Sequence, residues 1–418
     1  DTDREGFRFT AGLSFDLHYV GFAGGLNMAT GGGVGGVHGG VGRLRISAEA
    51  YPSAVPTRPR IVSRFPMAKY GGDRGMFRFV RRLDRLSELG ADTVLVETSG
   101  MGLSFAQTEE VREALLRFQA QGGKVVVYLE GGKLKHYFLA SIADRIISHP
   151  LDDLNIVGIA GRTLYYGDLL EKLGAKAEFV RIAEYKGAAE TYARSGASQP
   201  VADQRDLILM DSWNHIVRSI SKERGIPNQQ LVDWINHAPI GPAQAVEKGL
   251  IDELVHPDEL DESLEGWLRR RVRIDSPSSL PMQAGDWGKR AHVAVLFVAG
   301  DLYDGKSVVL PIVGRRLAGA ETLTAEIRKL RKDPDVRAIV VRIASRGGSA
   351  KAARDIVHEL DLAREVKPVI VSFGSVAASG GYWIATGGDY IFADATTATG
   401  SIGIFFPNMD LSGFMEKI

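Results

Sequence analysis

Two glycine-flanked turns contain the residues best suited to chemistry. Ser379 follows the apolar run 369–374 and precedes two glycines, which predicts a tight turn between a strand and a helix. An isolated serine at such a turn more often caps the helix. A second turn, Arg346-Gly347-Gly348-Ser349, also lies between a predicted strand and a predicted helix. Its backbone N–H groups could face a developing negative charge, so a serine nucleophile with an oxyanion hole is one interpretation.

A nucleophilic serine needs a base, because its hydroxyl is hardly ionised at neutral pH. α/β-Hydrolases supply a histidine that follows the serine in chain order, but the last of the nine histidines here, His358, precedes Ser379. A lysine can take this role if burial lowers its pKa enough to keep the amine neutral. Lys186, in the stretch E-Y-K-G-A-A-E, is a candidate, although an isolated lysine of this kind is more often a solvated helix residue.

The chain repeats one α/β pattern, and the two copies differ at the serine. Apolar runs alternate with helical periodicity at 94–130 and again at 338–374, which is typical of a parallel sheet covered by helices. The stretch HYFLASIADRIIS (136–148) corresponds to GYWIATGGDYIFA (381–393) at an offset of 245 residues. At this offset Ser379 corresponds to Leu134, so only the second copy carries Ser-Gly-Gly. The sequence therefore predicts a tandem duplication with a site in its second copy.

These patterns predict four segments along the chain. They are a Gly-rich, β-like extension (1–57), a first α/β repeat that supplies the lysine (58–272), a linker (273–290), and a second repeat that supplies the serine (291–418). The extension contains a formal G-x-G-x-x-G, but no parallel strand and helix surround it, so a dinucleotide loop is not predicted. The offset carries the second repeat beyond residue 418, and the chain begins at Asp1 rather than Met. We therefore expect a fragment of a longer protein.

Four motifs together resemble the signal peptide peptidase A family of Ser–Lys membrane proteases, in its long, tandem-repeat form. They are S-R-G-G-S (345–349), A-A-S-G-G-Y-W (377–383), T-G-S-I-G-I-F (399–405) and E-Y-K-G-A-A-E (184–190). The resemblance covers about residues 58–418 and implies tandem α/β units of the Clp protease/crotonase type. It implies that Ser379 is the nucleophile, Lys186 the general base and Ser401 the residue that orients the lysine. The oxyanion hole would be formed by the amides of Gly348 and Gly380.

The same resemblance implies where and on what the protein acts. It implies cleavage of hydrophobic peptides, such as released signal peptides, at a membrane surface of the bacterial cell envelope. The catalytic domains would lie on the periplasmic or extracytoplasmic side, with membrane association through segments absent from this chain. A dome-like homo-oligomer is implied, and no metal or organic cofactor.

Composition narrows the classes of protein that need to be considered. The chain has 51 basic and 51 acidic residues, so nucleic acid is not an expected partner. It has no cysteine, which excludes disulfides, thiolate zinc sites and a cysteine nucleophile. The uncharged stretch Pro368–Gly388 is long enough to span a bilayer, but it is interrupted by proline, serines and glycines. It is therefore predicted to form a strand, a turn and a helix rather than a membrane span.

One departure from the family pattern keeps two alternatives open. Arg346 stands where the family usually has a proline that fixes the backbone, so a looser oxyanion loop or an added charge near the substrate is expected. The first alternative is a catalytically inactive homologue that acts as a scaffold or binding module in the envelope. The second is an acyl-CoA enzyme of the crotonase type, which needs no serine and lysine paired across two repeats.

Overall fold

A computed structural model describes residues 7–17, 20–30, 36–46, 60–276, 291–311 and 314–417. The chain divides into two compact units, Asp1–Ser63 with Asp261–Gly288, and Arg64–Leu260 with Lys289–Ile418. Each unit is described by itself. Most of the predicted linker, residues 277–290, lies outside the described residues. Among the helices of the described ranges, none has both the length and the apolar character needed to cross a bilayer.

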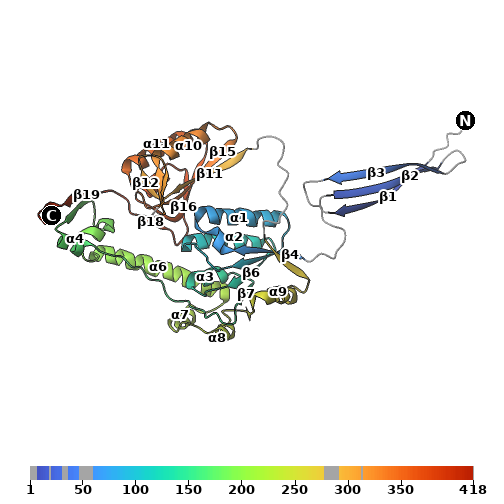
Figure 1. Cartoon of the computed structure of the whole chain (residues 1–418), viewed down its shortest axis with the longest axis horizontal. Helices are drawn as coiled ribbons and strands as arrows, with labels where there is room; N and C mark the ends of the chain where they lie inside the picture. The colour runs from blue at the N-terminus through green and yellow to red at the C-terminus, as the bar shows by residue number, and fades with distance from the viewer. Residues whose placement is uncertain are drawn as a thin grey trace. The chain divides into compact units, whose positions relative to one another are not determined.

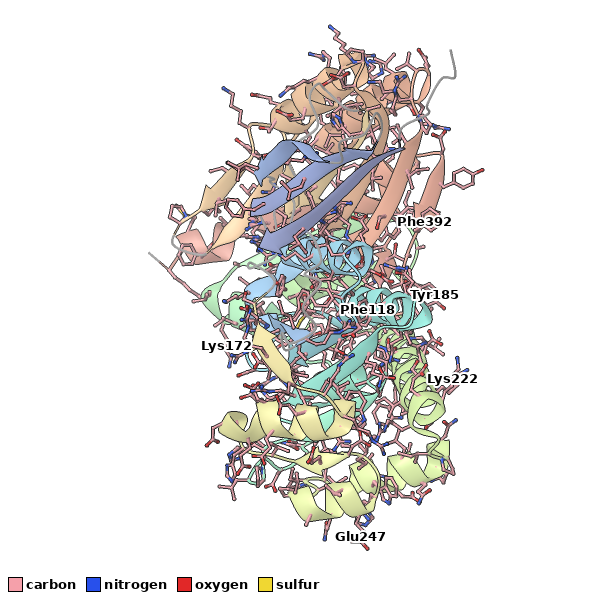
Figure 2. The ribbon with its side chains drawn as sticks, turned by 90° about the vertical axis from the view of Figure 1, so that its right-hand side faces the viewer. Phe118, Lys172, Tyr185, Lys222, Glu247 and Phe392 are labelled. Atoms are coloured by element: carbon pink, nitrogen blue, oxygen red, sulfur yellow. The ribbon has the colours of Figure 1, made fainter. Side chains whose placement is uncertain are left out.

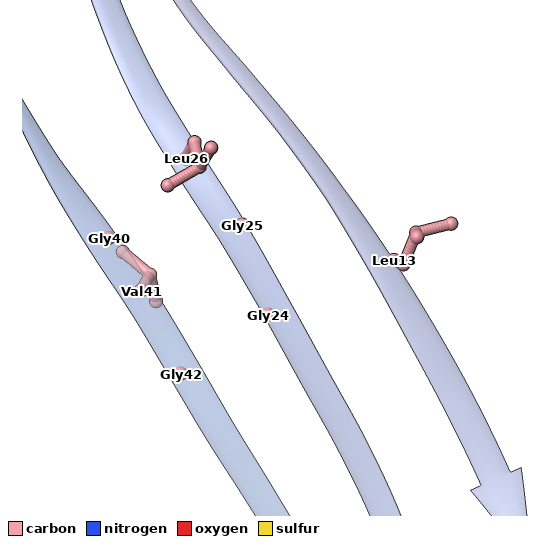
Figure 3. Close-up of a pocket in the computed structure, with 7 residues that line it drawn as sticks. All are labelled: Leu13, Gly24, Gly25, Leu26, Gly40, Val41 and Gly42. Atoms are coloured by element: carbon pink, nitrogen blue, oxygen red, sulfur yellow. The ribbon is translucent and has the colours of Figure 1, made fainter. Parts of the chain in front are cut away.

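The smaller unit contains an antiparallel three-stranded sheet, β1 (Phe7–Leu17), β2 (Val20–Thr30) and β3 (Gly36–Ile46). The predicted strands of the N-terminal extension are therefore confirmed, and glycines of the Gly-rich run lie in β2 and β3. The strand register pairs Leu13 with Gly24, and Gly24 with Gly42. Because these glycines have no side chains, an open apolar hollow lies over their backbone, and Leu13, Leu26 and Val41 line it (Figure 3). The unit also holds α9 (Leu260–Leu268) and β10 (Val272–Asp275), which pairs in parallel with the start of β4.

The first repeat is a sheet with strand order β4-β5-β6-β7-β9. Its strands are β4 (Arg60–Pro66), β5 (Thr93–Glu97), β6 (Lys124–Leu129), β7 (Arg145–Ser148) and β9 (Glu253–Leu254). The helices α1 (Gly72–Glu88), α2 (Phe105–Ala120) and α3 (Leu134–Ala140) connect or follow these strands. All five residues of β5 are buried, as expected for a strand covered on both faces. Each predicted strand and helix of this region is confirmed, within a few residues at its ends.

A helical excursion separates β7 from β9, and it carries the candidate lysine. Its elements are α4 (Gly167–Leu173), β8 (Lys176–Arg181), the 3-10 turn η2 (Gly187–Ala189), α5 (Glu190–Ala193), α6 (Gln199–Arg224), α7 (Asn228–Asn236) and α8 (Pro242–Glu247). The long α6 runs from the region of α4 toward α3 (Figure 1).

The second repeat reproduces the parallel sheet, with strand order β11-β15-β16-β17 and β18 added beside β16. Its strands are β11 (His292–Ala299), β15 (Val336–Ser345), β16 (Val369–Ala378), β17 (Tyr390–Phe392) and β18 (Ala398–Gly400). Its helices are α10 (Ala320–Lys332), α11 (Ala350–Arg364) and α12 (Gly380–Ala385). A small sheet of order β12-β14-β13 adds β12 (Asp301–Tyr303), β14 (Arg315–Gly319) and β13 (Val308–Leu310). The predicted strand, turn and helix across Pro368–Gly388 are confirmed as β16 and α12.

The two repeats meet within the larger unit, and both contribute to their contact. Helix α2 of the first repeat contacts β16 of the second (Figure 1). Strand β19 (Phe405–Asp410) leaves the second repeat and pairs antiparallel with β8 of the first. The turn before α13 (Ser412–Met415) continues from this ribbon. Because these contacts join segments about 200 residues apart, they bring the lysine region and the serine region together.

Candidate active site

Ser379 lies where β16 ends and α12 begins, in a backbone conformation that few non-glycine residues adopt. Its φ is 52° and its ψ is −119°. Its N–H donates to the carbonyl of Gly400 over 2.9 Å, and its own carbonyl accepts from the N–H of Trp383 over 2.9 Å. These bonds hold the strained turn between two parallel strands and a helix. Strain that the surrounding structure maintains is characteristic of functional sites and of nucleophilic serines at strand-to-helix turns.

Lys186 lies just before η2, and its side chain points into the protein. The residue is only 6% exposed, whereas its neighbour Tyr185 lies on the surface (Figure 2). The Arg181 guanidinium donates to the Lys186 carbonyl over 2.9 Å and to the Glu190 carboxylate over 2.8 Å, which fixes the turn. The side chain of Val201 on α6 packs so closely against Gly187 that a Cβ there would lie 2.6 Å from it.

The Lys186 amine reaches both candidate serines. Its Nζ lies 3.2 Å from Ser379 Oγ, 3.1 Å from Ser401 Oγ and 2.7 Å from the carbonyl oxygen of Gly403, and it also contacts the carbonyl oxygen of Ser401. All four contacting atoms are hydroxyl or carbonyl oxygens, so none adds a full negative charge that would favour the ammonium form. Burial lowers the pKa of Lys186. The structure thus places a lysine of reduced basicity within hydrogen-bond reach of a serine hydroxyl.

The second glycine turn lies against the first. Gly347 has φ +95° and Gly348 has φ +148°, and a Cβ on Gly347 would lie 2.9 Å from Ser379 Cβ. A Cβ placed on Gly380 would lie 3.5 Å from the amide nitrogen of Gly348, so the two predicted oxyanion amides belong to adjoining segments. The turn is tied to β12, because Leu302 N–H donates to the Gly347 carbonyl over 2.9 Å.

Arg346 leaves the turn and extends toward β12. Its side chain is exposed, and its guanidinium lies 3.7 Å from Asp301, whose carboxylate also accepts from Arg315. The turn is nevertheless held on its far side, where Ser349 Oγ donates to Asp304 over 2.6 Å and accepts from the N–H of Ala352 over 3.2 Å. The structure therefore places a positive charge beside the turn and shows hydrogen bonds that fasten the turn at Ser349.

Two contacts at this site were not foreseen from the sequence. The carbonyl of Gly403 accepts from Lys186, although the T-G-S-I-G motif had drawn attention to that stretch only for Ser401. Leu302 packs against Gly380 and bonds with the glycine turn, and nothing in its local sequence signalled this role.

Across the described ranges, no three histidine, aspartate or glutamate side chains gather in a way that would hold a metal ion.

Comparisons with known proteins identify the family and several relatives of this chain. The family model described as "Peptidase family S49" matches residues 117–268 and 361–418, one segment in each repeat. Protease 4 of Haemophilus influenzae is 33% identical over 318 residues, which cover 72% of this chain and 51% of that protein. The chloroplastic serine protease SPPA of Arabidopsis thaliana is 27% identical over 337 residues, which cover 78% of this chain and 49% of that protein.

A shorter relative carries a more specific name. The putative signal peptide peptidase SppA of Enterococcus faecium is 32% identical over 99 residues, which cover 23% of this chain and 29% of that protein. The chain spans about half the length of the two longer relatives that it matches. The family model matches a segment of each repeat, and these segments together make up half of the chain, which has a tandem α/β fold of the Clp protease/crotonase type; the chain therefore belongs to peptidase family S49.

Proposed function

We propose that the chain is a serine endopeptidase in which Ser379 and Lys186 form the catalytic dyad. The observation that supports this most strongly is the 3.2 Å separation of Lys186 Nζ from Ser379 Oγ, where the four oxygens that the amine contacts belong to hydroxyl and carbonyl groups. The relatives named as proteases support the reaction class. The two members of the dyad come from different repeats, so the site exists only when the repeats pack together.

The mechanism proposed is acyl transfer through a covalent intermediate. In the neutral amine, one N–H of Lys186 donates to the carbonyl of Gly403, the other donates to the Ser401 hydroxyl, and the lone pair faces the Ser379 hydroxyl. Nζ takes the hydroxyl proton while Oγ bonds to the peptide carbonyl carbon. The C–N bond then breaks, the new ammonium gives its proton to the leaving amine, and water hydrolyses the acyl-enzyme.

The remaining site residues act on geometry and charge. Ser401 Oγ, 3.1 Å from Nζ, orients the lysine. The amides of Gly348 and Gly380 donate to the oxyanion of the tetrahedral intermediate, where one such donor contributes about 2.7–4 kcal/mol. No step of this mechanism calls for a metal or an organic cofactor.

We propose hydrophobic peptides, such as released signal peptides, as substrates. Apolar side chains that are largely exposed, Ile182, Ile402 and Ile404, flank the lysine and Ser401 in the chain. The name of the Enterococcus faecium relative supports the same substrate class. We further propose a homo-oligomer at a membrane surface of the bacterial envelope, on its extracytoplasmic side. Its working units are the repeats 58–272 and 291–418, joined by the linker 273–290, and residues 1–57 precede them in the sequence.

Two substitutions test the dyad. Ser379→Ala and, separately, Lys186→Met should each lower the cleavage of an apolar fluorogenic peptide and of an activated ester, by on the order of 10²–10⁴-fold for the base. Lys172→Met is the matched control, because Lys172 is an exposed lysine on α4 (Figure 2). Full activity in either site variant would refute the assignment. A wild-type chain with neither cleavage nor serine reactivity would favour the inactive scaffold.

A further inference from the structure

A buried carboxylate on α2 contacts residues of both repeats. Glu109 is 8% exposed, and each of its two carboxylate oxygens contacts a neighbouring residue. One oxygen, Oε2, accepts from the N–H of Thr396 over 3.0 Å and from the Thr396 hydroxyl over 2.6 Å. The other, Oε1, contacts Nε2 of His215 on α6. Burial of a carboxylate is costly unless hydrogen bonds replace its water, so these contacts account for its place in the interior.

The contact with Thr396 leads directly to the candidate site. Thr397 Oγ1 donates to the Gly374 carbonyl over 3.0 Å, and Thr399 Oγ1 donates to the Ala377 carbonyl over 2.7 Å, so the segment is fastened along β16. It continues as β18, whose last residue, Gly400, accepts from the Ser379 N–H. The next residue is Ser401, which contacts Lys186. Only four residues of this hydrogen-bonded segment therefore lie between Thr396 and Ser401.

The contact with His215 leads to the lysine by another route. His215 lies on α6, and the same helix begins at Gln199, next to the turn that carries Lys186. There, Ser198 donates through its N–H and its hydroxyl to Glu190, over 2.8 Å and 2.6 Å. Val201, on the first turn of α6, packs against Gly187. Because one continuous helix joins these points, fixing His215 fixes the direction from which α6 supports the lysine turn.

We propose that Glu109 is a positioning residue, whose carboxylate holds the Ser401 segment and the α6 support of Lys186 in register across the two repeats. This inference rests on the proposed dyad. Its neighbours on α2 do not share the role. Glu110 pairs with Arg342, and Glu113, one turn further along the helix, is exposed.

Removal of the carboxylate should slow chemistry more than it weakens substrate binding. Without Glu109 the Thr396 segment loses two donated hydrogen bonds, and the distance from Lys186 to Ser379 is no longer fixed from both sides. A displacement of about 1 Å in a reacting group costs on the order of 10²-fold in rate. We expect Glu109→Ala to lower kcat by about 10- to 100-fold with a much smaller change in KM.

The test compares Glu109→Ala, Glu109→Gln and Thr396→Val in the full chain, with Glu113→Ala as the matched control on the same helix. The glutamine amide oxygen can still accept from Thr396, so Glu109→Gln should recover part of the lost kcat. Thr396→Val should also lower kcat. The fold-loss in kcat of the double variant Glu109→Ala/Thr396→Val should be smaller than the product of the two single fold-losses. Glu113→Ala should leave kcat unchanged.

Fluorophosphonate titration of Ser379 measures the fraction of folded, competent sites, and kcat is expressed per titrated site. The inference would be overturned if Glu109→Ala had the wild-type kcat per site. It would also be overturned if Glu109→Gln and Glu109→Ala lost the same amount of kcat and neither loss were coupled to that of Thr396→Val. Failure of the dyad itself has a different signature, namely retained activity in Lys186→Met. If Glu109→Ala does not fold, the kcat of Thr396→Val decides, and a wild-type value there overturns the inference.

Discussion

At the residue scale, the proposed chemistry depends on the surroundings of one lysine. Lys186 is buried among hydroxyl and carbonyl oxygens, and burial lowers its pKa below the 10.5 of an ordinary lysine. A carboxylate partner would act in the opposite direction by favouring the ammonium. The absence of a carboxylate among the four oxygens that the amine contacts is therefore consistent with the proposed role of Lys186 as a base for the Ser379 hydroxyl.

The pH dependence of activity follows from this lysine. Only the neutral amine can take the Ser379 proton, so kcat/KM should rise with pH through the pKa of Lys186 and fall as the amine is protonated. Because burial lowers that pKa, the acid limb should lie below 10.5. Stopped-flow or fluorogenic assays across the pH range would locate it. A limb at or above the ordinary lysine value, or activity independent of pH, would contradict this role.

At the element scale, two glycine turns and two strands form the site. The apolar runs predicted β5, β6, β15 and β16 because strands covered on both faces need continuous apolar sequence. The small sheet β12-β14-β13 was not predicted, since its strands are only three to five residues long and mostly exposed. Its Leu302 nonetheless supports the turn of Gly347 and Gly348.

Gly347 lies so close to the Ser379 turn that there is no room for a side chain at this position. Its φ is +95°, and a Cβ would lie 2.6 Å from the Gly380 nitrogen and 2.9 Å from Ser379 Cβ. Gly347→Ala should therefore displace the nucleophile and lower kcat by on the order of 10²-fold. Stability should fall by about 1–3 kcal/mol. Steady-state kinetics with thermal unfolding would measure both, and wild-type kcat in this variant would contradict the close approach.

The interface between repeats contains a second buried charge cluster. Arg342 on β15 bonds with Asp73 on α1, over 2.9 Å, and with Glu110 on α2. Burial raises the pKa of Glu110 to about 7 and that of Asp394 to about 6. Because one guanidinium faces three carboxyl groups, and Asp394 hydrogen-bonds with Glu110, the cluster holds a proton to a higher pH than free carboxyl groups would.

This cluster predicts how stability changes with pH. The folded state holds the Glu110 proton more tightly than the unfolded chain, whose glutamate has a pKa of 4.5. The contribution is therefore greatest below that value and is lost as pH rises to about 7. Glu110→Gln should reduce the difference in unfolding free energy between about pH 5 and about pH 8, measured with urea. An unchanged difference would show that the proton lies elsewhere.

At the scale of the whole molecule, the proposed site takes its lysine from the first repeat and its serines from the second. The motifs predicted Ser379, Lys186 and Ser401, and the structure brings these three together. The sequence could not indicate Glu109, His215 and Thr396, because Glu109 lies 287 residues from Thr396 along the chain. Contacts between repeats depend on tertiary packing, and neither strand periodicity nor a local motif encodes them. Arg342, a charged residue within a predicted buried strand, is the feature of the sequence that comes nearest to indicating a contact between the repeats.

Association of chains should depend on the ribbon that joins the repeats. Register places Val180 of β8 beside Phe406 of β19. Ile182 is 85% exposed and Phe406 is 72% exposed, and contiguous exposed apolar side chains mark interaction surfaces. Ile182→Ser combined with Phe406→Ser should lower the mass seen in sedimentation velocity. Leu151→Ser, at another residue that is 81% exposed, serves as control. An unchanged mass in the double variant would exclude the ribbon as the contact.

Reaction of the 418-residue chain with a fluorophosphonate, followed by peptide mapping, tests the central claim most directly. The account predicts one adduct, on Ser379, formed at a rate that falls by on the order of 10²-fold or more in Lys186→Met while the fold is unchanged. An unlabelled Ser379 in a chain that cleaves peptides, or equal labelling with and without the lysine, would contradict it.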